Sequence, residues 1–187
     1  MGLSTSFKSE LKKSSDFMSG VFVNECTIVS VKPVYGGKEW QNEKYKDDVG
    51  LDITIDIGKS FQPVFYVGGR LKRDEFGEVK DLGTVRRIAT FFDAIDVDAK
   101  LTDEHKIEED VLPDCIGTKF NRLSYVSGTK QDGKVRYSDF QEVVSFNGPS
   151  ITLIETFKKH VNNGWLKNYK PELMDNGSDT NDIPGGW

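Results

Sequence analysis

The chain has 187 residues, of which 29% are charged and 36% are hydrophobic. This length is enough to bury a core and the composition is that of an ordinary globular protein, so we expect one domain with additional terminal segments. No apolar run approaches the roughly 18 residues that a membrane-spanning helix needs, and residues 1–19 contain lysines without an apolar segment behind them. We therefore expect a cytoplasmic protein that does not contact a membrane.

The net charge of −5 is unevenly distributed along the chain. Residues 93–114 contain nine carboxylates and two lysines, and residues 170–187 contain four carboxylates and one lysine, so the remaining residues sum to +5. A mildly basic body with its acidic residues segregated into two segments is compatible with a polyanionic partner.

Residues 1–18 are rich in Ser and Lys and lack convincing helix caps, so we predict a mobile N-terminal arm. The alternative is a docking helix, because Leu3, Phe7 and Leu11 recur at helical spacing. The two cysteines, Cys26 and Cys115, have no Cys or His neighbour at metal-ligand spacing. We expect two reduced, buried thiols and no cofactor.

Three strands are predicted in the first half of the chain. The clearest covers residues 51–57, where apolar residues alternate strictly with Asp and Thr. The strand before it, over residues 21–32, changes its apolar parity between Ile28 and Val29, which indicates one extra residue and a bulge. Residues 61–67 are expected to pair with the central strand.

The loop between the first two strands interleaves aromatic residues with lysines. Exposed rings stack on bases while ammonium groups neutralise phosphates, so this loop is a candidate nucleic-acid contact. In the alternative, Trp40 and Tyr45 pack under the loop and the lysines are solvated. The candidate residues are Lys38, Trp40, Lys44, Tyr45 and Lys46.

The third strand leads into a second basic stretch, formed by Arg70, Lys72 and Arg73. Cations in this position are candidates for binding phosphate. The alternative is a solvated hairpin tip held by salt bridges, since three carboxylates follow, at Asp74, Glu75 and Glu78.

A helix is predicted after this stretch. Thr84 is a candidate cap, and Val85, Ile88 and Phe92 form one apolar stripe that ends near Ile95. We expect this helix to cover the core.

Residues 118–126 and 135–144 read as two strands of a hairpin whose turn contains Asp132 and Gly133. Cations and aromatic residues alternate along this hairpin, which makes it a further candidate contact. The residues are Lys119, Arg122, Tyr125, Lys130, Lys134, Arg136 and Tyr137.

Five strands with one helix between the third and the fourth is the element order of an oligonucleotide-binding (OB) barrel. We therefore predict a mainly β protein with a five-stranded OB-fold-like barrel over residues 19–146. In this fold, strands two and three and the loops joining strands one to two and four to five make the ligand face. Both loops are basic and aromatic in this sequence.

Beyond the barrel, residues 147–169 contain an amphipathic helix over 151–162 and a linker. The helix has two candidate partners, the barrel and a second subunit, so a homodimer is compatible with the sequence. Residues 170–187 contain few apolar residues, and we predict a disordered acidic tail.

The tail contains Asp182-Ile183-Pro184 near its end. Together with the barrel prediction, this resembles single-stranded DNA-binding proteins, in particular the compact ones of tailed bacteriophages. The tail of bacterial members closes with Asp, Ile, Pro and a terminal Phe, and it recruits replication and repair proteins. In this chain Gly185, Gly186 and Trp187 replace the single Phe, which retains an aromatic residue at the end. The segment Ile116-Gly117-Thr118-Lys119 that enters the hairpin is similar to phage barrels of this type.

The resemblance implies that the protein binds single-stranded DNA without strong sequence preference, in the host cytoplasm if a phage encodes it, during replication, recombination or repair. No catalysis is expected. Asp52 and Asp56 would repel phosphate, so we expect DNA to follow the basic loops and the strand around Phe65 and Tyr66. The residues that would bind partner proteins are Asp179, Asp182, Ile183, Pro184 and Trp187.

Two other classes of function stay open. The first is a scaffold or adaptor protein, in which the barrel and the C-terminal helix bind protein and not DNA. The second is a metal-dependent nuclease that would use Asp93, Asp96 and Asp98, although these residues lack the ligand spacing of a known cation loop.

Overall fold

The computed structural model describes residues 18–35, 47–102, 106–145, 148 and 150–176. The chain falls into two compact units. The first unit contains Met1–Asn24, Arg122–Phe140 and Pro149–Trp187, and the second contains Glu25–Asn121 and Gln141–Gly148. Each unit buries its own set of apolar side chains.

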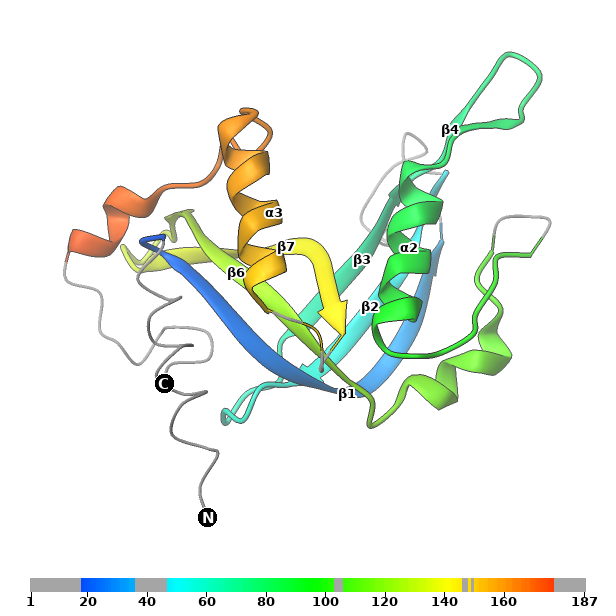
Figure 1. The fold of residues 1–187 in the computed structure, drawn as a ribbon, viewed down its shortest axis with the longest axis horizontal. Coiled ribbons are helices and arrows are strands. Elements are labelled where there is room, and N and C mark those ends of the chain that lie inside the picture. The colour runs from blue at the N-terminus through cyan, green and yellow to red at the C-terminus, as the bar shows by residue number, and fades with distance from the viewer. Residues whose placement is uncertain (1–17, 36–46, 103–105, 146–147, 149, 177–187) are drawn as a thin grey trace. The chain divides into compact units, whose positions relative to one another are not determined.

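Five strands form one sheet in the order β3-β2-β1-β6-β7, as Figure 1 shows. The strands are β1 (Val21–Tyr35), β2 (Asp48–Asp56), β3 (Val64–Arg70), β6 (Lys119–Thr129) and β7 (Val135–Ser145). The first three are neighbours in sequence, and β6 returns to lie beside β1. This spatial order of fourth, first, second and third strand is that of a Greek key.

The central strand predicted over residues 51–57 is confirmed as β2, which pairs antiparallel with both β1 and β3. Its apolar residues Leu51, Ile53 and Ile55 are completely buried. Asp52 and Thr54 alternate with them and lie on the opposite face of the sheet, which we call the outer face.

The bulge predicted in the first strand is also confirmed. The register between β1 and β2 shifts between Ile28 and Ser30, so Val29 is the extra residue. Because of this shift, Ile28 and Val31 both pack in the core although they are three residues apart.

The predicted helix is confirmed as α2 (Gly83–Ala94), which buries Ile88, Phe91 and Phe92. The predicted cap is wrong, because Leu82 occupies the cap position and Thr84 lies inside the helix. The Thr84 hydroxyl instead donates a hydrogen bond of 2.9 Å to the carbonyl oxygen of Arg70, at the end of β3.

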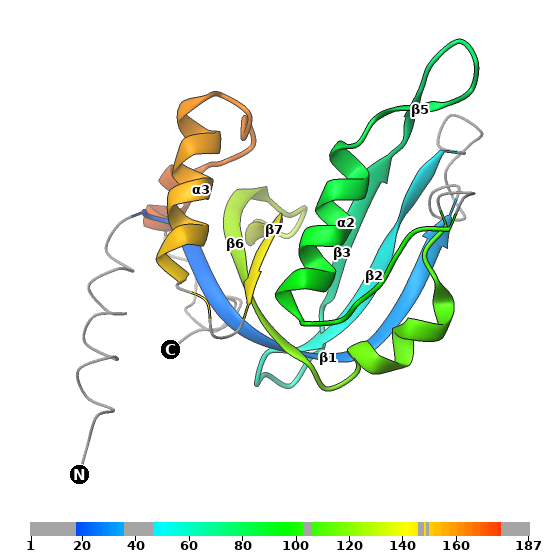
Figure 2. The ribbon, with the colours of Figure 1, turned by 45° about the vertical axis from the view of Figure 1, so that its right-hand side comes forward.

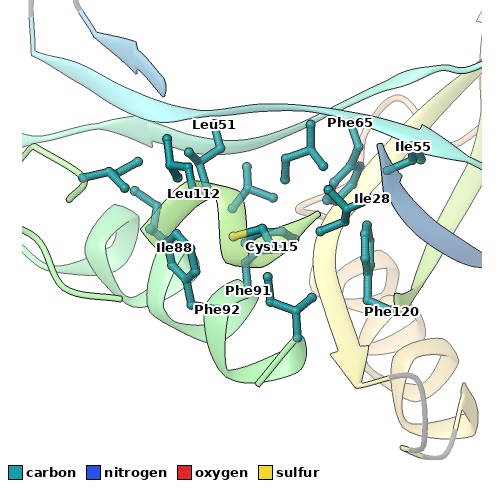
Figure 3. Packing of buried hydrophobic residues seen from close by; sticks show 14 of the residues in the cluster. Ile28, Leu51, Ile55, Phe65, Ile88, Phe91, Phe92, Leu112, Cys115 and Phe120 are labelled. Carbon is teal, nitrogen blue, oxygen red and sulfur yellow. The ribbon is translucent and has the colours of Figure 1, made fainter. Parts of the chain in front are cut away.

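Aromatic rings from three elements meet in the core of the second unit, as Figure 3 shows. The ring centroid of Phe120 lies 5.6 Å from that of Phe65 on β3 and 5.6 Å from that of Phe91 on α2. Such tilted and edge-to-face pairs stabilise the packing beyond the area that they bury.

Both cysteines are free and buried in the same core, as predicted. Cys115 ends the 3-10 helix η2 (Glu109–Cys115), and Figure 3 shows it among the side chains of the buried cluster. Burial, assisted by the nearby Asp114 carboxylate, raises the pKa of the Cys115 thiol to about 11. The thiol is therefore protonated at neutral pH.

The predicted mainly β architecture with five strands is confirmed, but the sheet is not closed into the predicted barrel. In the part of the chain that the structure describes, β3 and β7 stand at the two ends of the strand order and do not pair with each other. A physical reason lies at β3, where two carbonyl oxygens accept hydrogen bonds from α2. Arg87 donates to Gly68 over 2.7 Å, and Thr84 donates to Arg70.

A separate two-stranded hairpin leaves the sheet between β3 and α2. Its strands are β4 (Lys72–Arg73) and β5 (Val79–Asp81), and we call residues 72–81 the arm. Figure 1 and Figure 2 both show the arm extending past the first turn of α2.

In the first unit, the predicted C-terminal helix is confirmed as α3 (Ser150–Asn162). The ring of Phe157 on this helix packs against Tyr125 of β6 and Phe140 of β7, with centroid distances of 5.1 and 5.3 Å. Of its two candidate partners, α3 therefore contacts the β6–β7 hairpin of its own chain. No helix in the described residues is long and apolar enough to cross a membrane.

The expected start of the disordered tail at residue 170 is too early. The 3-10 helix η3 (Pro171–Asn176) follows α3, and the Lys170 amide donates to the Val126 carbonyl over 2.9 Å. Tyr169 packs its ring on Phe157, which also holds this segment to the first unit. Apolar residues such as Leu173 and Met174 are partly buried there, which the acidic composition concealed.

Candidate nucleic-acid interface

Cations gather in the second unit where β3 leads into the arm. The Nε atom of Arg70 lies 3.2 Å from Oδ1 of Asp48, and the Nε atom of Arg73 lies 3.0 Å from Oδ1 of Asp47. The two arginine side chains are 40% and 36% exposed. Ion pairs at this exposure contribute about 0–1 kcal/mol, so a phosphate can replace the carboxylate at little cost.

Lys72 lies between these two arginines in the sequence and is the first residue of β4. Its side chain is exposed. The structure therefore brings together three predicted phosphate contacts at one end of the sheet. The acidic partners of the two arginines are Asp47, which immediately precedes β2, and Asp48, the first residue of β2. Tyr35, the last residue of β1, is the register partner of Val49, so the described residues on both sides of 36–46 lie at this same end.

Tyr66 lies on the outer face of β3, above a pair of glycines. Gly50 and Gly68 are register partners, and a Cβ atom added to Gly50 would lie 2.8 Å from the Tyr66 hydroxyl oxygen. A Cβ atom on Gly68 would lie 2.7 Å from the same oxygen. The two glycines therefore leave the space that the phenol end of Tyr66 occupies.

The electrostatic surroundings of Tyr66 are mainly acidic. Desolvation raises the pKa of its hydroxyl, the Asp48 and Asp52 carboxylates raise it further, and Arg87 lowers it. The hydroxyl is therefore neutral at physiological pH and able to donate a hydrogen bond. The ring is half-buried, so part of it remains accessible for stacking on a base.

The remainder of the outer face of β2 carries the two carboxylates that were expected from the sequence to repel phosphate. Asp56 is exposed and its carboxylate accepts a hydrogen bond of 2.8 Å from the Gly58 amide. Asp52 stands opposite Lys32 on one side and Tyr66 on the other. Within β2, the outer face thus presents the carboxylates of Asp52 and Asp56, and the exposed Lys32 of β1 stands opposite Asp52.

The structure corrects the assignment of Phe65 as a DNA contact. Phe65 is completely buried, because its side chain points to the core face while its neighbour Tyr66 points outward. Only one of two consecutive strand residues can face a ligand on the outer face.

Two assignments in the first unit are corrected for the same reason. Tyr125 is buried under α3 and donates a hydrogen bond of 3.1 Å to the side-chain oxygen of Asn168. Arg122 is 2% exposed and donates to Asp139 over 2.8 Å. Burial raises the pKa of Asp139, although the Arg122 guanidinium opposes this shift. Neither Tyr125 nor Arg122 can reach DNA without unfolding its surroundings.

The other predicted residues of the β6–β7 hairpin are accessible to different degrees. Lys119 pairs over 3.0 Å with Glu25, and both side chains are about half exposed. Tyr137 is partly buried, with its ring centroid 5.8 Å from that of Phe22. Three cations are exposed at or near the tip of the hairpin, namely Lys130, Lys134 and Arg136.

Several predicted residues lie outside the described residues. They are the loop residues Lys38, Trp40, Lys44, Tyr45 and Lys46, and the tail residues Asp179, Asp182, Ile183, Pro184 and Trp187.

Sequence reasoning missed Phe76, which lies at the tip of the arm and is 83% exposed. A signal was present, because a single aromatic residue stands between Glu75 and Gly77 in an otherwise polar turn. An aromatic residue in such a turn has no strand or helix face against which to be buried.

The chain matches no protein-family model and none of the curated proteins with which it was compared. Among the described residues, no group of three or more His, Cys, Asp or Glu side chains is arranged to hold a metal ion. Of the acidic residues considered for a nuclease, Asp93, Asp96 and Asp98 are described and are not part of such a group.

Proposed function

We propose that this protein binds single-stranded DNA without strong sequence preference, and protects it during replication or recombination. The observation that carries the proposal is the Greek-key strand order with cations gathered where β3 leads into the arm. The OB fold is a five-stranded, partly open Greek-key barrel, and its second and third strands and their flanking loops bind oligonucleotides. We therefore propose an OB fold that is open between β3 and β7.

The position of α2 supports this fold. It stands in the chain after the third strand of the sheet and before the fourth, β6, which is the place of the helix in the OB order. The arm is an additional hairpin inserted before this helix.

In the proposed mechanism, basic side chains contact the DNA backbone and aromatic rings contact the bases. Arg70, Lys72 and Arg73 would bind phosphates, and bases would stack on Tyr66 and on Trp40 or Tyr45 of the segment between β1 and β2. Each stacked base typically contributes about 1–3 kcal/mol, and every base offers a π face, so stacking gives affinity without sequence preference. No catalytic group is needed.

The proposal includes two further roles. The exposed cations of the β6–β7 hairpin would bind phosphate, as the corresponding loop of OB folds does. The acidic tail, with Asp182, Ile183, Pro184 and the terminal Trp187, would recruit replication or recombination proteins in the cytoplasm.

The test is the affinity of Lys72→Ala for fluorescein-labelled oligo-dT over a series of salt concentrations. Loss of one phosphate contact should weaken binding and make the slope of log K against log salt shallower by about 0.7. The matched control is Lys59→Ala, because Lys59 follows β2 at the opposite end of the β2–β3 pair and should leave the slope unchanged. Equal slopes for both variants and the wild type would contradict this site.

The same titration tests the lack of sequence preference. Unlabelled mixed-sequence single strands should compete about as well as oligo-dT, and duplex DNA of the same length should compete poorly. A duplex that competes equally well would exclude a mechanism based on unstacked bases.

A further inference from the structure

The arm presents one aromatic side chain to solvent. Phe76 is 83% exposed, more than any other large hydrophobic side chain among the described residues. It stands at the tip of a hairpin that projects past α2 in both views of the fold (Figure 1 and Figure 2). An apolar ring in this position has no role in the core.

Hydrogen bonds hold the tip in one conformation. The Asp74 carboxylate accepts from the amides of Phe76 and Glu78, both over 2.9 Å. The Asp74 amide donates to the Glu78 carbonyl and the Gly77 amide donates to the Asp74 carbonyl. Gly77 has a φ of +83°, which favours glycine at this point of the turn. The ring of Phe76 is therefore carried by an ordered turn, which reduces the entropy lost when it binds a ligand.

Arg73 connects the tip to the candidate interface. Its Nη1 atom donates to the Gly77 carbonyl over 2.9 Å, and its Nε atom donates to Asp47 over 3.0 Å. Asp47 immediately precedes β2 in the sequence. One guanidinium thus joins the turn that carries Phe76 to the end of the sheet where Arg70 and Lys72 lie.

The charge of the arm indicates what Phe76 would contribute. Beyond Lys72 and Arg73, residues 74–81 contain one cation and four carboxylates, so this part of the arm has a formal charge of −3. An acidic segment adds no attraction for phosphate. Its contribution to binding DNA would therefore come from contact between the ring and a base.

We propose that Phe76 is a base-stacking residue of the DNA interface, positioned by the Asp74 turn and by Arg73. This inference rests on the proposed function. It extends the interface from the end of β3 along the arm, and it separates an apolar contact from the ionic contacts of Arg70 and Lys72.

The test compares Phe76→Ala with the intact chain for oligo-dT affinity at several salt concentrations. The expected result is affinity weaker by on the order of tenfold, with an unchanged slope of log K against log salt. Phe76→Tyr should bind like the wild type, because it keeps a ring that can stack. Since Phe76 is exposed, thermal unfolding should be the same for all three proteins.

The matched control is Phe61→Ala. Phe61 is 53% exposed and lies between β2 and β3, at the end of these strands opposite the arm, so its loss should leave DNA affinity unchanged. If the wild type binds oligo-dT and Phe76→Ala binds equally well, the inference is overturned while the proposed function stands. The exposed Phe76 ring would then be a candidate contact for a partner protein. A shallower salt slope in Phe76→Ala would also overturn stacking. Absence of binding by the wild type would overturn the proposed function itself.

Discussion

Arg122 and Asp139 form an ion pair in which the arginine side chain is 3% exposed and the aspartate side chain 28%. Removing a charge from water is costly, and the attraction between the partners offsets this cost only while both are present. The pair therefore has a structural role in the first unit, where it joins β6 to β7.

Asp139→Ala should destabilise the protein by about 3–5 kcal/mol, because the buried Arg122 guanidinium would lose its counter-charge. Urea unfolding measures this loss. Glu25→Ala is the control, since Glu25 pairs with Lys119 at the surface and its loss should cost at most about 1 kcal/mol. Similar small losses in both variants would show that the Arg122–Asp139 pair is not structurally important.

The sequence was enough to pick out the aromatic and basic candidate residues, but it did not show which of them are exposed on the folded protein. Tyr66 and Phe65 are consecutive aromatic residues of one strand, and the alternation of side chains allows only one of them to face outward. Tyr125 and Arg122 stand among cations in the sequence, yet α3 and Asp139 cover them. These contacts come from segments that sequence spacing does not relate to β6.

At the scale of elements, β2 and β3 approach each other closely at a glycine pair. A Cβ atom on Gly50 would lie 2.6 Å from the carbonyl oxygen of Val67, which no side-chain rotation can relieve. The same glycines leave the space above the strands that Tyr66 occupies. The position of this ring therefore depends on the absence of two side chains.

Gly50→Ala should destabilise the protein by about 1–3 kcal/mol, as overpacking against a fixed backbone does. Thr54→Ala is the matched control, because Thr54 lies on the same strand and the same face and its substitution should cost less than about 1 kcal/mol. Chemical unfolding of both variants measures the loss in the free energy of unfolding. A loss for Gly50→Ala no larger than that for Thr54→Ala would contradict the close approach.

Long elements with a clear period were predictable from the sequence. The alternation over residues 51–57 and the parity change at Val29 follow directly from side-chain direction in a strand, and both are confirmed. The arm strands contain only two and three residues, too few to show a period. Segment 171–176 is held by contacts with other parts of the first unit. These contacts could not be predicted from its acidic composition.

At the scale of the whole molecule, the order of strands and helix could be predicted, and closure of the sheet could not. The order follows from where apolar periods and turns fall along the chain. Closure of the sheet requires the two edge strands, β3 and β7, to pair with each other. On β3 the carbonyl groups of Gly68 and Arg70 instead accept hydrogen bonds from α2. Nothing in the spacing of residues 83–94 indicates that Thr84 and Arg87 would serve this purpose.

In the proposed function, the cations at the end of β3 bind phosphate, and the rings of Tyr66 and Phe76 stack on bases. Such binding has two joint signatures, a change in aromatic fluorescence and a loss of affinity with salt. A protein-binding adaptor would show neither with an oligonucleotide.

The most direct test is a titration of the intrinsic tyrosine and tryptophan fluorescence of the intact chain with oligo-dT at a low and a high salt concentration. If the protein binds single-stranded DNA as proposed, quenching should be saturable, and the affinity should fall with salt by a log–log slope of about −0.7 for each phosphate bound. No fluorescence change at either salt concentration, or an affinity that does not depend on salt, would contradict the proposed function.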